Sequence, residues 1–215
     1  MAKTNGDWLY RNRYIIGGAI ALTIVGVVLY ASREKISTKV KTLAKENLGG
    51  FKWFDESLKW YRDSKTKDIV DKLHPKFIPK VKEFFSRVEK ELGLQMYGTS
   101  GYRNFAEQLA LNKQNPSNAK AGLSGHNYGF AVDVNVIDPK TRKIILRKNS
   151  TSEEWEKSGV VKIAKEMGFK WGGGGAFKGY HDPVHFYIDP NGMNTAQLLV
   201  LHNSGKVDEN GYVVV

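Results

Sequence analysis

An uncharged apolar run stands near the N-terminus of the sequence. Residues 14–31, YIIGGAIALTIVGVVLYA, carry no charge, and basic residues lie just before and after them. As a helix this run would be about 27 Å long at 1.5 Å per residue, close to the roughly 30 Å hydrocarbon core of a bilayer. A cleaved signal peptide has a shorter apolar run, of about 7–15 residues, and LYAS is a poor cleavage site. We therefore predict an uncleaved transmembrane anchor, with an orientation that the flanking charges leave open.

The pattern becomes basic and amphipathic over residues 32–67. Apolar residues recur at helical spacing between 36 and 48 and again between 51 and 61, and Gly49-Gly50 separates the two stretches. The second stretch, FKWFDESLKWYRDS, is either a membrane-surface or substrate-stacking helix or a helix that packs on the domain that follows. We favour the packed helix.

From Asp68 onward, short helical and strand patterns alternate. Residues 74–94, HPKFIPKVKEFFSRVEKELGL, predict a helix with an apolar face that ends at Gly93. Further helices are predicted in NFAEQLALNKQ (104–114), in SEEWEKSGVVKIAKEMG (152–168, with a serine N-cap) and at the start of the tail, before a small hairpin. Strands are predicted in LQMYGTSGYR (94–103), FAVDVNVI (130–137), its hairpin partner KIILR (143–147) and VHFYI (184–188). Together they predict an α+β fold, a small antiparallel sheet with flanking helices.

Composition and charge narrow the possible functions. The chain has 215 residues with 12% aromatic residues, which argues against disorder, and a formal net charge of +11. That charge attracts polyanions such as nucleic acid, anionic lipid or cell-wall polymers. The lysines and arginines form no clustered patch or nucleic-acid-binding motif, so we expect no nucleic-acid partner. The absence of cysteine excludes disulfides, thiolate metal sites and a cysteine nucleophile.

Two histidines and one aspartate stand in contexts that fit a single site. In SGHNYGFAVDVNV (124–136), His126 lies between glycines that allow tight turns, and Asp133 interrupts an apolar strand. A buried carboxylate without a partner is costly, so Asp133 should meet a cation, a metal or a hydrogen-bond network. His185 begins the strand in GYHDPVHFYI (179–188). Two imidazoles and one carboxylate suit a zinc ion whose fourth position is open to water, whereas we expect His74 and His202 to be structural.

Three more residues are candidates for the chemistry. Asp182 precedes His185 by three residues, close enough to serve as a general base without binding the metal. His181 is an alternative base or a stabiliser of the tetrahedral intermediate, and an ordinary exposed loop histidine is an equal alternative. Arg103, which follows a predicted strand, is placed to hold a substrate carboxylate or a developing oxyanion.

These stretches carry a resemblance to a known family. TSGYRNFAEQ, SGHNYGFAVDV and KWGGGGAFKGYHDPVHFYI resemble, in order and spacing, the three signature blocks of the D-alanyl-D-alanine carboxypeptidase and L-alanyl-D-glutamate peptidase family. That family has the LAS metallopeptidase fold, shared with lysostaphin and sonic hedgehog. The resemblance covers about residues 68–189. The glycine-rich stretch before His181 departs from the pattern of the family. The resemblance therefore does not predict which residues line the substrate-binding side of the site.

The resemblance implies a set of roles. It implies one Zn²⁺ ion with ligands His126, Asp133 and His185, Asp182 as the catalytic base, and Arg103 as the arginine that stabilises the substrate or intermediate. Ser124 of the motif and Tyr128 are counted with Arg103 as candidate substrate-binding residues. An aspartate base is typical of the phage-endolysin and wall-peptidase branch, whereas the vancomycin-resistance dipeptidases use glutamate.

The sequence therefore predicts a membrane-anchored zinc peptidase that cleaves peptidoglycan stem peptides. We divide it into a basic N-terminal segment (1–13), the anchor (14–31), a basic juxtamembrane segment (32–67), the peptidase domain (68–193) and a C-terminal tail (194–215). The domain would face the cell wall from a bacterial envelope, or belong to a phage lytic enzyme in a membrane-containing virion. The alternative is a catalytically silent, zinc-containing wall-binding module. The bond that is cut and the oligomeric state stay open.

Overall fold

The computed structural model describes residues 58–175 and 180–215. The anchor predicted at 14–31, and the part of the basic segment before residue 58, lie outside the described residues. Within the described ranges, no helix combines the length and hydropathy needed to span a membrane. The described residues all belong to one compact unit.

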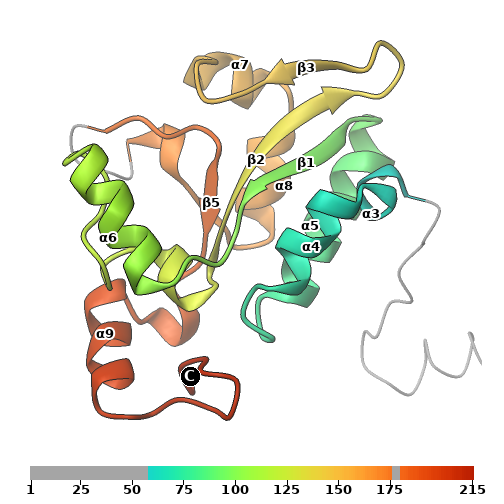
Figure 1. Cartoon of the computed structure of the whole chain (residues 1–215). Coiled ribbons are helices and arrows are strands. Elements are labelled where there is room, and N and C mark those ends of the chain that lie inside the picture. Colours follow the sequence, from blue (N-terminus) through green and yellow to red (C-terminus); the bar gives the residue numbers. More distant parts are fainter. Residues whose placement is uncertain (1–57, 176–179) are drawn as a thin grey trace, which may run out of the picture. The chain divides into compact units, whose positions relative to one another are not determined.

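Helices and strands alternate along this unit (Figure 1). The α-helices are α3 (Lys59–Arg62), α4 (Ser64–Asp71), α5 (Ile78–Leu92), α6 (Phe105–Gln114), α7 (Ser152–Lys157), α8 (Val160–Glu166) and α9 (Thr195–Asn203). The strands are β1 (Gln95–Ser100), β2 (Ala131–Asp138), β3 (Lys143–Leu146), β4 (Lys170–Trp171) and β5 (His185–Tyr187). Short 3₁₀ helices are η1 (Gly125–Tyr128), η2 (Gly172–Gly174) and η3 (Pro190–Gly192). The predicted α+β class, a small antiparallel sheet with flanking helices, is confirmed.

Strand β2 is the centre of the sheet. The strand order is β1-β2-β5-β4, and β3 also pairs with β2. All pairings are antiparallel: β5 pairs with β2 from Ala131 to Asp133, and β3 pairs with the other end of β2. The hairpin predicted between β2 and β3 is therefore confirmed, and β5, far along the chain, lies beside the start of β2.

The two faces of β2 meet different surroundings because side chains alternate along a strand. Val132, Val134 and Val136 are fully buried, whereas Asp133 and Asn135 are only partly buried. In β5, Phe186 is fully buried and contacts Phe84 of α5, with ring centroids 5.2 Å apart. Even-numbered residues of both strands therefore face the core, and odd-numbered residues face the opposite side of the sheet.

Helix α5 supplies the other half of this core. Its four fully buried side chains, Val81, Phe84, Phe85 and Val88, recur at helical spacing. Pro79 near its start and Gly93 at its end, in the left-handed region at φ 67°, set its limits. In Figure 1, α6 and α9 lie on the other side of β1 and β2 from α3, α4 and α5.

Two helices stand where the sequence predicts one helix over residues 152–168. The predicted single helix and its predicted serine N-cap are both wrong. Gly159 separates α7 from α8 with φ 84°, a left-handed conformation that an α-helix does not contain. The N-cap is Thr151 and not the predicted serine, and Thr151 forms a capping box with Glu154.

Residues before 68 and after 193 also pack in the described unit. Trp60 of α3 is fully buried, and its ring lies edge-on to Phe85 with centroids 5.6 Å apart. The packed-helix interpretation of this stretch therefore holds for α3. At the other end, Leu198 of α9 is buried, and residues after it form the Val207–Val213 bridge. The tail consequently forms part of the same core.

Candidate metal centre

Strand pairing brings Asp133 and His185 together. The two residues lie directly opposite each other in the antiparallel β2–β5 pair. Because both have odd numbers, both side chains point away from the core, and directly opposed side chains on one face are neighbours. His185 Nδ1 lies 2.8 Å from Asp133 Oδ1. The pairing register therefore supplies two of the three candidate ligands.

The third candidate ligand, His126, comes from the 3₁₀ helix η1, just before β2. Gly129, at φ 70°, ends η1 and turns the chain into the strand. A Cβ at this position would lie 2.4 Å from the backbone nitrogen of His74, so only glycine fits this approach. The peptide group of His126 is fixed as well, because the Arg103 backbone N–H donates to its carbonyl at 3.1 Å.

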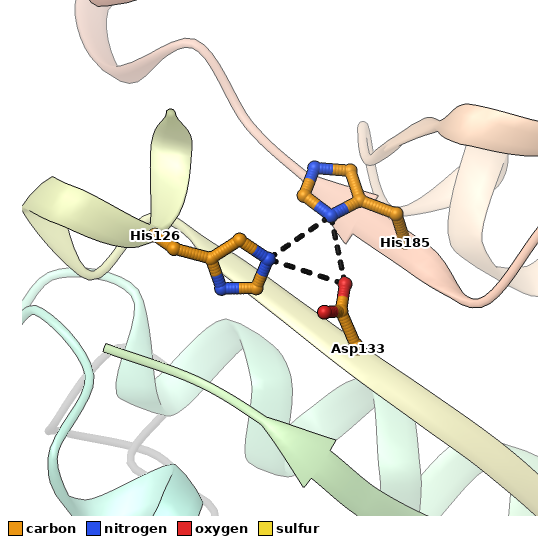
Figure 2. A group of neighbouring side chains, drawn as sticks. All are labelled: His126, Asp133 and His185. Carbon is orange, nitrogen blue, oxygen red and sulfur yellow. Dashed lines mark hydrogen bonds and ion pairs between the residues drawn. The ribbon is translucent and has the colours of Figure 1, made fainter. Parts of the chain in front are cut away.

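The three side chains converge on one point (Figure 2). His126 Nε2 lies 3.2 Å from Asp133 Oδ1 and 3.1 Å from His185 Nδ1. His126 Nδ1 lies 2.6 Å from the Gly101 carbonyl oxygen, which only accepts, so the ring proton resides on Nδ1. A neutral His126 then presents the lone pair of Nε2 to a carboxylate oxygen. A metal ion between these atoms would be bound by all three of them.

The donor set and spacing fit a zinc ion. Ligand atoms around a tetrahedral zinc ion, with bonds of about 2.0–2.1 Å, stand about 3.3 Å apart, close to the separations seen here. The donation from His126 to a backbone carbonyl is the outer contact that typically fixes the tautomer of a metal-binding histidine. Among the described residues, these three form the group able to hold a metal ion.

Burial sets the protonation of this group. Burial of the fully enclosed His126 ring lowers its pKa, against the opposing charge of Asp133. Burial by itself would raise the pKa of Asp133, but the two histidines hold it well below its usual range. The lowered pKa of His126 favours a neutral ring, and the lowered pKa of Asp133 favours an ionised carboxylate. This is the protonation state in which these side chains bind metal.

Two candidate residues border the metal-binding group with polar atoms that lack a partner among the described residues. Arg103 Nε and Asp182 Oδ1 are both buried and unbonded. Burial, and then the charge of Asp133, raise the pKa of Asp182. Burial lowers the pKa of Arg103, while Asp133 and Asp182 oppose that shift. A buried polar atom without a partner is uncommon, and both are placed to bind a group that enters the site.

The other predicted site residues have different surroundings. His181 is exposed, and its Nε2 lies 3.5 Å from the Ser150 carbonyl oxygen. Ser124 is buried, and its hydroxyl accepts a 3.4 Å hydrogen bond from the backbone of His126. Tyr128 is 2% exposed, and its hydroxyl donates to the Gly122 carbonyl at 2.7 Å. In these contacts Ser124 and Tyr128 support the loop that carries His126, and their substrate-binding role stays a prediction.

Asn127 has a positioning role that the sequence did not reveal. Its amide nitrogen donates to the Arg103 carbonyl at 2.9 Å, and its amide oxygen accepts from the Gly122 backbone at 2.9 Å. It thus joins the Arg103 loop to the His126 loop. The signal was its place beside His126 in the motif, whereas the carbonyl of Gly101, being backbone, leaves no signal in residue type.

Comparison with known proteins assigns the family. A model of the D-alanyl-D-alanine carboxypeptidase family matches residues 117–188, which include all three candidate metal ligands and Asp182. The chain is also 31% identical, over 144 residues, to the peptidoglycan L-alanyl-D-glutamate endopeptidase CwlK of Bacillus subtilis (strain 168), covering 61% of this chain and 84% of that protein. The chain belongs to this family of zinc-dependent peptidoglycan peptidases.

Two solved structures of peptidases are also similar to this family member. One is the Serratia marcescens L-Ala D-Glu endopeptidase ChiX, with 18% identity, a TM-score of 0.45 and coverage of 60% of this chain and 91% of that chain. The other is VanYB in complex with D-alanine-D-alanine, with 17% identity, a TM-score of 0.41 and coverage of 60% and 82%. These likenesses are weak, so the family assignment rests on the sequence relative.

Proposed function

We propose that this peptidase hydrolyses a peptide bond in the stem peptides of peptidoglycan, with one zinc ion held by His126, Asp133 and His185. The observation that carries the proposal is the convergence of these ligand atoms within 4.8 Å of one another, beside two buried polar groups without partners. The family relationship supports the choice of substrate, because the relative from Bacillus subtilis is a peptidoglycan endopeptidase.

When bound, a zinc ion would supply Lewis-acid chemistry here, since it polarises a carbonyl group and makes water a stronger nucleophile near neutral pH. Asp182 would take a proton from the attacking water and return it to the leaving amine. Its raised pKa suits this exchange, because a carboxyl group with a higher pKa is a stronger base once ionised. The turn between Asp182 and His185, in which His185 N–H donates to the Asp182 carbonyl at 3.1 Å, fixes the base relative to a ligand.

Arg103 would bind negative charge on the substrate or on the tetrahedral intermediate. Its guanidinium group is half-buried and keeps Nε without a partner among the described residues. A buried cation that lacks a partner costs stability, and a charged hydrogen bond to the substrate removes that cost when the complex forms. Asn127 holds the Arg103 backbone for this contact.

We favour the bond between L-alanine and D-glutamate over the terminal D-alanyl-D-alanine bond. Asp182 is an aspartate, in agreement with the wall-peptidase branch that the motif resembles, and CwlK is an L-alanyl-D-glutamate endopeptidase. The family model that matches the chain is described as a D-alanyl-D-alanine carboxypeptidase, which is the alternative bond.

We further propose that residues 14–31 anchor the peptidase to a membrane, with the catalytic unit facing the wall. The uncharged run in the sequence supports this arrangement. A chain lacking residues 1–31 should stay in the supernatant after ultracentrifugation, whereas the full chain should sediment with membranes. Equal partitioning of the two would contradict the anchor and leave the catalytic proposal intact.

The test of the proposed function is digestion of purified peptidoglycan by the full chain in detergent, with and without a chelator. We expect chelator-sensitive products, restored by added zinc, whose masses name the bond. Release of stem peptides indicates an endopeptidase, and loss of one alanine per stem indicates a carboxypeptidase. A folded, zinc-loaded protein that binds peptidoglycan but yields no products would contradict the proposal in favour of the silent binding module.

A further inference from the structure

The loop between β3 and α7 is held by hydrogen bonds and contacts the chain just before the candidate base. Its backbone turns between Arg147 and Ser150, where the Ser150 N–H donates to the Arg147 carbonyl at 2.9 Å. Trp155, fully buried in α7, donates from its ring nitrogen to the same carbonyl at 3.4 Å. The Ser152 hydroxyl donates to the Gly173 carbonyl at 2.6 Å, which ties the loop to the chain that leads toward Asp182. The loop is therefore held at both ends.

Lys148 projects from this loop to the segment that contains Asp182. Its Nζ donates to the Tyr180 hydroxyl at 3.0 Å and lies 5.6 Å from the centre of the same ring. Tyr180 precedes Asp182 by two residues. His181 reaches the same loop at the Ser150 carbonyl, at 3.5 Å. Two contacts, at Tyr180 and at His181, thus join the Lys148 loop to the chain just before Asp182.

The charge of Lys148 acts on the site. The hydrogen bond to Tyr180 raises the pKa of Lys148, and the negative charges of Asp182 and Asp133 raise it further against the cost of burial. Lys148 is in turn the first of the groups that lower the pKa of Asp182. The charges of the same two carboxylates raise the pKa of Arg103, against the larger lowering by burial. These two charges therefore act on cations from two separate loops.

Lys148 differs from those lysines of the described unit that form ion pairs. Lys72, Lys157 and Lys170 each pair with a carboxylate, at 2.8, 2.7 and 2.5 Å respectively. Within residues 58–175 and 180–215, Lys148 has no carboxylate within ion-pair distance, and its hydrogen bond goes to a neutral phenol. The phenol fixes the ammonium group and leaves its other protons for another acceptor, since a lysine ammonium has three donors.

We propose that Lys148, positioned by Tyr180, is a substrate-binding residue that takes the free α-carboxylate of the D-glutamate residue in the stem peptide. The inference rests on the proposed function and narrows its substrate to peptides in which this carboxylate is not amidated. With Asp133 bound to the metal, the carboxylate of Asp182 still repels an anionic substrate, and a cation on a neighbouring loop offsets that repulsion.

A different role for Lys148 would be to tune Asp182 alone. Removing the cation would then raise the pKa of Asp182 and change the turnover of every substrate by the same factor. A carboxylate-binding role instead changes the ratio between substrates with and without that carboxylate. The ratio is therefore the measurement that separates the two roles.

The experiment uses the full chain, zinc-loaded in detergent, and two synthetic peptides. Both contain the L-alanyl-γ-D-glutamyl-L-lysine sequence, one with the free α-carboxylate of D-glutamate and one with this group amidated. We compare kcat and KM for the wild type, Lys148→Met, Lys148→Arg and Lys143→Met. Lys143 is an exposed lysine of β3 and serves as the matched control.

We expect the wild type and Lys143→Met to prefer the free carboxylate. Lys148→Met should lower that preference about tenfold in kcat/KM, mainly through KM, and Lys148→Arg should restore most of it. An unchanged preference in Lys148→Met, with active wild type, overturns this inference and leaves the peptidase function in place. Cleavage confined to D-alanyl-D-alanine peptides has the same consequence. If the wild type cleaves neither kind of peptide, the result contradicts the proposed function and also the inference that rests on it.

Discussion

His74 and His126 are both buried histidines, but their ring nitrogens meet different partners. His74 Nδ1 accepts from the Lys76 backbone N–H at 3.1 Å, and its Nε2–H donates to the Val213 carbonyl at 3.0 Å. Both nitrogens are therefore satisfied by the backbone, and the ring stacks on Phe130 with centroids 4.2 Å apart. At His126, the backbone satisfies one nitrogen and the other faces a carboxylate oxygen and a second imidazole.

This difference separates a structural histidine from a ligand without reference to any other protein. His74 needs nothing further, because each donor meets an acceptor, and it fastens the C-terminal tail to the start of α5. His126 instead presents Nε2 to the other two candidate ligands, where a metal ion could be bound. The expectation that His74 is structural is supported by its contacts, and the predictions below test the two regions against each other.

The largest effect is expected from replacing His126. His126→Ala should reduce bound zinc from about one ion per chain to none after dialysis and abolish peptidoglycan cleavage, because two remaining ligands hold zinc weakly. His74→Ala should keep the full zinc content. Metal analysis of the two variants in parallel checks this. Full retention of zinc by His126→Ala would refute its role as a ligand.

Replacing Asp182 should separate the base from the ligands within the same region. Asp182→Asn should retain zinc and lower kcat by about 10²–10⁴-fold, the usual contribution of a general base. Asp68→Asn, which removes an exposed carboxylate paired with Lys72, is the matched control and should have normal kcat. Zinc content and kcat are measured on the same preparations. A near-normal kcat for Asp182→Asn contradicts its role as the base.

The third effect concerns stability and falls on His74. His74→Ala removes the stacking on Phe130 and leaves the Val213 carbonyl and the Lys76 N–H without partners. We expect the free energy of unfolding to fall by about 2 kcal/mol. Urea unfolding of both proteins, with zinc present, gives the difference. His74→Gln, which keeps a side-chain amide, should lose less; equal losses in the two variants would argue against the hydrogen bonds as the cause.

The smallest effect is a dependence of stability on pH. Burial lowers the pKa of His74 below its unfolded value of about 6.5. As pH falls below about 6.5, the unfolded chain takes up a proton that the folded chain does not, so stability is lost with acidification. The difference in unfolding free energy between wild type and His74→Gln should therefore shrink from pH 7.5 to pH 5.5. Other groups titrate in both proteins and cancel, and a constant difference would contradict a neutral His74.

Much of the fold could be predicted because local patterns and tertiary packing agree. The spacing of Phe77, Phe84 and Phe85 predicts α5, and the alternation in FAVDVNVI predicts which face of β2 carries Asp133. The convergence of His126, Asp133 and His185 followed from motif order, since each context fits the same chemistry.

What the sequence did not reveal depends on contacts between distant segments. The helical pattern of residues 152–168 is continuous, and the break at Gly159 comes from its left-handed backbone. Lys148 carries no motif, because its place beside Tyr180 depends on the β2–β3 pairing, whose register shifts between Val136 and Ile137. The stretch that contains Trp60 was expected to pack on the domain that follows, but its partner Phe85 in α5 could not be predicted from that stretch.

The most direct test of the central claim is anomalous diffraction at the zinc edge from crystals of the zinc-loaded protein. We expect one strong peak at bonding distance from His126 Nε2, Asp133 Oδ1 and His185 Nδ1, with Asp182 near the ion but not bound to it. No peak at this position from protein that contains one zinc ion per chain, or a peak at another group of residues, would contradict the assignment of this cluster as the metal centre.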